Sequence, residues 1–95
     1  MTNYHEPQEK LCDKARSLTC ALNSLKEEIE AVDWYHQRID VEQGEALKAI
    51  LKHNMHEEIE HACMTLEWLR RNMDGWDEEL NTYLFKKDDI AQLEE

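Results

Sequence analysis

The chain has 95 residues, which is enough for one domain, and its two glycines and one proline favour a helical fold. It carries 22 acidic and 11 basic residues, for a formal net charge of −11. This charge argues against binding to nucleic acid or to an anionic membrane and suits a protein that attracts cations, although ordinary solubility also accounts for it. No apolar run approaches the ~18 residues of a membrane span. The three cysteines lack zinc-type spacing, so we expect reduced thiols and a cytoplasmic location.

Residues 1–6 are expected to form a disordered arm that ends at Pro7, a residue suited to the first turn of a helix. A long helix should follow, because apolar residues then recur at alternating spacings of four and three. This heptad-like stripe comprises Leu11, Ala15, Leu18, Leu22, Leu25, Ile29, Val32 and, further on, Ile39. The pattern breaks over residues 40–44, where Gly44 is the expected turn.

A second long helix is predicted over about residues 45–72. One face at helical spacing carries Leu47, Ile50, Leu51, Asn54, Glu58, His61, Ala62, Thr65, Trp68 and Leu69. Asp74 and Gly75 should end this helix, a shorter helix is expected over residues 77–85, and residues 87–95 form a charged tail. The sequence therefore predicts an all-α, single-domain chain, an antiparallel two-helix hairpin with a short C-terminal helix. So small a chain buries little surface alone, which favours dimerisation into a four-helix bundle.

A carboxylate and an imidazole lie near the centre of the second helix's apolar face. Glu58 and His61 form a Glu-x-x-His motif, and a buried carboxylate is costly unless it is paired or bound to metal. Glu28 lies sixteen residues before Gly44 and Glu58 fourteen after it, so an antiparallel hairpin brings the two level. Ferritin-like di-metal sites take one Glu from each of two helices and a Glu-x-x-His motif from each of the other two. This chain holds half of that set.

Two copies would supply four carboxylates and two imidazoles, which suits two divalent iron ions, with manganese or zinc as competitors. The predicted chemistry is oxidation of Fe(II) by O2. Two alternatives stay open: a structural helical dimer or adaptor whose buried polar residues fix register, and a module that holds zinc or calcium without turnover. The further histidines and glutamates at positions 53, 56, 57 and 60 are expected to form a solvated face.

Two longer stretches resemble a known family. Residues 27–38 read EEIEAVDWYHQR and residues 57–71 read EEIEHACMTLEWLRR. Both are similar to the encapsulated ferritins of bacteria and archaea, and the likeness extends from about His5 to Phe85.

The resemblance implies a half-ferritin that dimerises into a ferroxidase centre for iron storage and detoxification. It also implies that dimers assemble into a decameric ring, which is cargo inside an encapsulin shell in the cytoplasm. By motif match, Glu28, Glu58 and His61 are iron ligands and Tyr35 lies close to the centre. Glu27 and Glu30 match acidic positions that bind a metal on its way in, and Trp34 matches the aromatic residue that gates that route.

One feature departs from the family pattern. Encapsulated members usually carry a C-terminal targeting peptide with small and apolar residues after a flexible linker, whereas this sequence ends at Gln92-Leu-Glu-Glu95. Either the sequence is truncated or the protein is not cargo in this form. The iron centre is unaffected by this departure.

Overall fold

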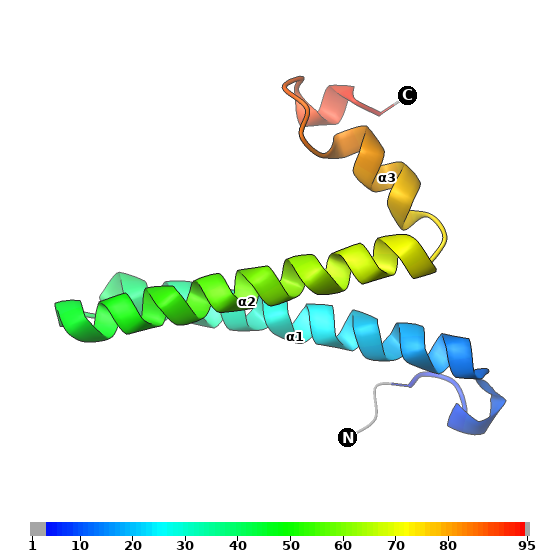
Figure 1. Cartoon of the computed structure of the whole chain (residues 1–95), viewed down its shortest axis with the longest axis horizontal. Helices are drawn as coiled ribbons and strands as arrows, with labels where there is room; N and C mark the ends of the chain where they lie inside the picture. The colour runs from blue at the N-terminus through cyan, green and yellow to red at the C-terminus, as the bar shows by residue number, and fades with distance from the viewer. Residues whose placement is uncertain (1–3, 95) are drawn as a thin grey trace.

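The computed structural model describes residues 4–94. In chain order it contains η1 (Gln8–Lys10), α1 (Asp13–Val41), α2 (Glu45–Asn72), α3 (Trp76–Tyr83) and η2 (Ile90–Gln92). Figure 1 shows α1 and α2 side by side as a hairpin, with α3 turned away from the far end of α2. No strand occurs within residues 4–94, so the predicted all-α hairpin is confirmed. Residues 1–3 of the expected disordered arm, and the last residue of the tail, lie outside the described part.

The first helix begins later and ends later than the sequence pattern indicated. Residues 8–10 form a short 3-10 helix, and α1 begins at Asp13 because the Cys12 sulfur accepts a hydrogen bond (3.4 Å) from the backbone N–H of Ala15. Such a cap satisfies one of the free donors of a helix's first turn. At its other end α1 continues to Val41. Glu42 then accepts a hydrogen bond of 2.8 Å from the N–H of Gly44 and closes the turn.

The boundary between α2 and α3 depends on Gly75. Its φ of +102° lies in the left-handed region that glycine adopts without steric cost. The chain therefore leaves α2 after Asn72 and enters α3 at Trp76, one residue earlier than predicted. The third helix ends at Tyr83, two residues before the predicted end.

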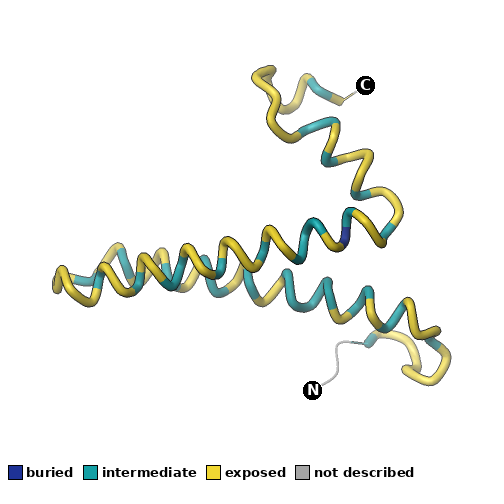
Figure 2. The backbone as a smooth tube through the Cα atoms, in the orientation of Figure 1, coloured by how far each residue is buried: buried dark blue, intermediate teal, exposed yellow. Residues whose placement is uncertain are grey.

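The hairpin is a single layer of helices, because the described part measures only 18 Å along its shortest axis. Leu69 is the one fully buried residue among residues 4–94, and much of the hairpin in Figure 2 is half-buried or exposed. The predicted stripe is wider than the seam that α1 and α2 share. The inclusion of Ile29 was wrong: it is 57% exposed, whereas the neighbouring Glu28 is half-buried. Leu47, Ile50 and Trp68 are also exposed.

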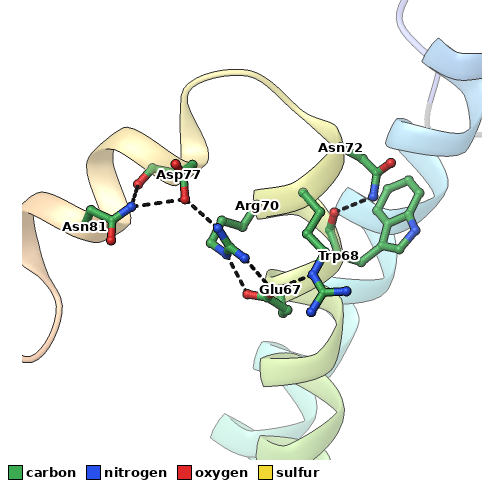
Figure 3. A network of polar contacts seen from close by, with 7 residues as sticks. Glu67, Trp68, Arg70, Asn72, Asp77 and Asn81 are labelled. Atoms are coloured by element: carbon green, nitrogen blue, oxygen red, sulfur yellow. Dashed lines mark hydrogen bonds and ion pairs between the residues drawn. The ribbon is translucent and has the colours of Figure 1, made fainter.

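A polar network fixes α3 to the end of α2 (Figure 3). The Arg70 guanidinium donates two hydrogen bonds of 2.7 Å to the Glu67 carboxylate and a third, of 2.5 Å, to Asp77 of α3. Arg71 donates a further bond to Glu67, and Asn81 donates to Asp77. The bonds from Arg70 and then Arg71 lower the pKa of Glu67 to about 2. Glu67 therefore stays ionised at any ordinary pH.

Among the described residues, no helix combines the length and the apolarity that a membrane crossing demands.

Candidate metal centre

Glu58 and His61 form a hydrogen-bonded pair on α2. One turn of helix brings the Nδ1 of His61 to 3.0 Å from the Oε1 of Glu58. The Glu58 side chain is 28% exposed and the His61 side chain 48%. The hydrogen bond that His61 donates to Glu58 raises the pKa of His61. The negative charges of Glu58, Glu28 and Glu57 act in the same direction, and partial burial acts against them. The predicted Glu-x-x-His motif thus brings its two side chains together.

Glu28 lies on α1, within the half-buried seam of the hairpin. Its charge acts on His61 of α2, so the hairpin brings the two sides of the predicted ligand set near each other. Its Oε1 atom is buried and has no hydrogen-bond partner in the described part of the chain. A buried carboxylate oxygen without a partner carries a large desolvation cost, which calls for a donor or a cation that the protomer does not supply.

A single protomer does not hold a complete site. Within the described residues, no group of three or more histidine, cysteine, aspartate or glutamate side chains is arranged to hold a metal ion. Glu28, Glu58 and His61 would therefore need further ligands to enclose a metal.

The other predicted site residues lie along α1 beside Glu28. Tyr35 is half-buried, and the guanidinium carbon of Arg38 lies 5.4 Å from the centre of its ring. This cation–π contact was not predicted, although the i, i+3 spacing of Tyr35 and Arg38 in the sequence indicated that the two side chains could meet. Glu27 and Glu30 are exposed, and Trp34 is half exposed. The metal-binding and gating roles of these residues remain predictions.

The remaining histidines of α2 lie on the exposed side of the helix. His53 Nε2 is 3.6 Å from Glu57 Oε1, with the two side chains 71% and 48% exposed. His56 and Glu60 are exposed as well. This agrees with the solvated face that the sequence indicated. The three cysteines are free and exposed.

The sequence pattern of the EncFtn-like family matches residues 3–87, which is most of the chain. The chain belongs to the EncFtn-like family. This EncFtn-like chain is 60% identical over 92 residues to a ferritin-like protein of Thermotoga maritima, a match that covers 97% of this chain and 81% of that protein. It is 52% identical over 90 residues to an encapsulated ferritin-like protein of Rhodospirillum rubrum. That match covers 95% of this chain but 64% of the relative, so the chain spans less than two thirds of that protein.

A solved structure shares the fold of this EncFtn-like chain. The crystal structure of protein ne0167 from Nitrosomonas europaea superposes with a TM-score of 0.92 at 49% sequence identity. The superposition covers 95% of this chain and 99% of that one. The predicted resemblance to encapsulated ferritins is therefore confirmed, and membership of this family indicates an iron-related, ferritin-like role.

Proposed function

We propose that two copies of this chain build a ferroxidase centre, at which Fe(II), the substrate, is oxidised to Fe(III) by O2. Each copy supplies Glu28 from α1 and Glu58 and His61 from α2. The pair then offers four carboxylates and two imidazoles around two iron ions. The four negative charges balance two divalent cations, and oxygen-rich ligation with imidazole suits iron.

The observation that carries this proposal is the buried, unpartnered Oε1 of Glu28. Nearly all buried polar atoms in folded proteins have a partner, and those that lack one call for an explanation such as a missing ion. The hydrogen-bonded pair of Glu58 and His61 lies nearby on the neighbouring helix. A divalent cation bound by Glu28 would satisfy this oxygen.

The chain's own residues prepare the ligands. The bond between Glu58 and the Nδ1 of His61 fixes the imidazole ring and leaves its Nε2 free. Only the neutral imidazole binds a metal, so iron must displace the proton that the surrounding carboxylates help His61 to retain. Binding of iron should therefore release protons.

The exposed acidic residues Glu27 and Glu30 would attract Fe(II) toward the centre, and Trp34 beside them would gate that route. Tyr35 would lie close to the iron. We further propose that dimers assemble into a decameric ring inside an encapsulin shell in the cytoplasm. The 52% identity to an encapsulated ferritin-like protein of Rhodospirillum rubrum supports the shell partner. Zinc, manganese or calcium would occupy the centre as substitutes for iron.

The test is the initial rate at which ferric absorbance rises when Fe(II) is added to the protein in air. Glu28→Ala, Glu58→Ala and His61→Ala should each reduce this rate sharply. In a two-fold symmetric dimer, each substitution removes two ligands from the centre, one from each copy. Glu78→Ala, which changes an exposed carboxylate on α3, is the matched control and should leave it unchanged.

Unchanged rates in all three ligand variants would reject the proposal. Metal binding without oxidation would instead indicate a non-catalytic metal-binding module. Dimerisation with no metal dependence at all would indicate a structural dimer or adaptor.

A further inference from the structure

Arg38 differs from the other arginines of the chain in the group that its guanidinium contacts. Arg16, Arg70 and Arg71 each form an ion pair with a carboxylate. Arg38 forms no ion pair within residues 4–94, and its guanidinium carbon lies 5.4 Å from the centre of the Tyr35 ring. In a chain with 22 acidic residues, an arginine that lies on an aromatic ring instead of a carboxylate calls for an explanation.

The local sequence explains why no carboxylate binds this guanidinium. Residues three and four apart are neighbours on a helix, and those at these distances from Arg38 are Trp34, Tyr35, Val41 and Glu42. The one carboxylate among them, that of Glu42, closes the turn after α1 through a hydrogen bond of 2.8 Å. Two aromatic rings remain, and the guanidinium lies over Tyr35.

Tyr35 lies on the same side of α1 as Glu28. Seven residues separate the two, so their directions around the helix differ by only about 20°. Both residues are half-buried, whereas Arg38 is exposed and lies about 60° from Tyr35 around the helix. The guanidinium therefore covers the side of the Tyr35 ring that would otherwise face solvent.

The direction of side chains on a helix adds to this restraint. Long and aromatic side chains lean toward the N-terminus of their helix. Arg38 thus reaches back over Tyr35, and Tyr35 leans toward the turns that carry Glu28, whose Cα lies ~10.5 Å away along the axis. With the guanidinium over it, the ring is held in the seam and does not swing out to solvent.

We propose that Arg38 is a positioning residue for the candidate metal centre, because it holds the Tyr35 ring so that the phenol points along the seam toward Glu28. There the phenol O–H is a hydrogen-bond donor for the oxygen ligands of the centre. This inference rests on the proposed function and deepens it. A cation–π contact at an exposed site alters the population of the held conformer by about 2- to 5-fold, so Arg38 tunes the rate of oxidation.

The contact itself is tested without iron, by NMR of the full-length chain with labelled tyrosine in the presence of a chelator. Arg38→Met should move the ring signals of Tyr35, which are assigned with Tyr35→Phe, and should leave those of Tyr83 in place. Arg38→Lys, which keeps a cation, should move them less. Lys26→Met removes an exposed positive charge from the same helix and is the matched control, with no shift expected. Unmoved Tyr35 signals in Arg38→Met would overturn the proposal.

The role in oxidation is tested by the initial rate of ferric absorbance as a function of Fe(II) concentration. Arg38→Met should lower the maximal rate about 2- to 5-fold and leave the half-saturating Fe(II) concentration unchanged, because the metal ligands are intact. Arg38→Lys should recover part of the rate, and Lys26→Met should keep all of it. In a Tyr35→Phe background the loss of Arg38 should have no further effect, because the hydroxyl that it positions is absent.

The failure of this proposal differs from the failure of the proposed function. If the native chain oxidises Fe(II) and Arg38→Met does so equally fast, the role of Arg38 is overturned and the ferroxidase function stands. An equal loss of rate with and without the Tyr35 hydroxyl would also overturn it, since Arg38 would then act on the fold. If Arg38→Met moves the Tyr35 signals and the native chain oxidises no iron, the ferroxidase function is rejected and with it the effect of Arg38 on the rate.

Discussion

Replacement of Glu28 by leucine should make the metal-free protein more stable while it removes iron oxidation. The buried Oε1 of Glu28 has no hydrogen-bond partner in the described part of the chain, and an unsatisfied buried polar atom costs about 1–3 kcal/mol. Leucine has a similar size and adds apolar surface to the seam between α1 and α2. Because other atoms of Glu28 reach solvent, we expect the lower part of that range, about 1 kcal/mol.

For a chain of this length, 1 kcal/mol corresponds to a rise in Tm of about 4–8 °C. The assay is thermal unfolding followed by circular dichroism at one fixed protein concentration, first with a chelator and then with Fe(II) under anaerobic conditions. With the chelator, Glu28→Leu should unfold at the higher temperature. With Fe(II), the native chain should unfold at a higher temperature than Glu28→Leu, because only the native chain gains stability from the bound ion.

The matched control is Glu27→Leu, at the exposed neighbouring position on α1. Surface changes of this kind alter stability by about 0.5 kcal/mol or less. A metal-free Glu28→Leu protein that unfolds below the native chain would refute the reasoning, since the carboxylate would then be stabilising the hairpin rather than awaiting a cation.

Two further predictions concern the helix ends. Cys12→Ser should raise the free energy of unfolding by up to about 1 kcal/mol, since a hydroxyl is a better N-cap acceptor than the thiol that now binds the N–H of Ala15; chemical denaturation measures this, and a loss of stability would contradict it. The folded-state pKa of Glu67 is lowered from 4.5 to about 2, so its contribution to anchoring α3 is complete above pH 4.5 and is lost as the pH falls through about 2. The fluorescence of Trp76 should therefore stay constant from pH 7 to about pH 4.5 and change below it, whereas Arg70→Met should show the changed signal even at pH 7.

The hairpin could be predicted from the sequence because its signals are local. Two stretches with helical apolar periodicity are separated by Gly44, and the length of each stretch fixed the helix within a few residues. The start of α1 was missed because Pro7 is a good first-turn residue, whereas the cap that begins the helix is a thiol at Cys12, a weak and uncommon acceptor.

The candidate site shows what periodicity cannot resolve. Ile29 and Glu28 are adjacent in the sequence, and hydrophobicity alone assigned the seam to Ile29. In the structure Glu28 is half-buried at this seam, whereas Ile29 is 57% exposed. The pairing of Glu58 with His61 could be predicted because the two residues are one helical turn apart. The anchoring of α3 by Arg70 could not be predicted, because Arg70 and Asp77 lie on different helices whose relative direction depends on the backbone at Gly75.

The scarcity of buried side chains has a consequence for the life of the protein in a cell. With Leu69 alone fully buried among residues 4–94, an isolated copy has little to hold it folded. If copies pair as proposed, the melting temperature should rise with the concentration of the protein. Synthesis rate would then set the fraction that is folded as well as the number of molecules. Newly made chains that fail to meet another copy would be removed by proteases, so a scarce protein would also be a short-lived one.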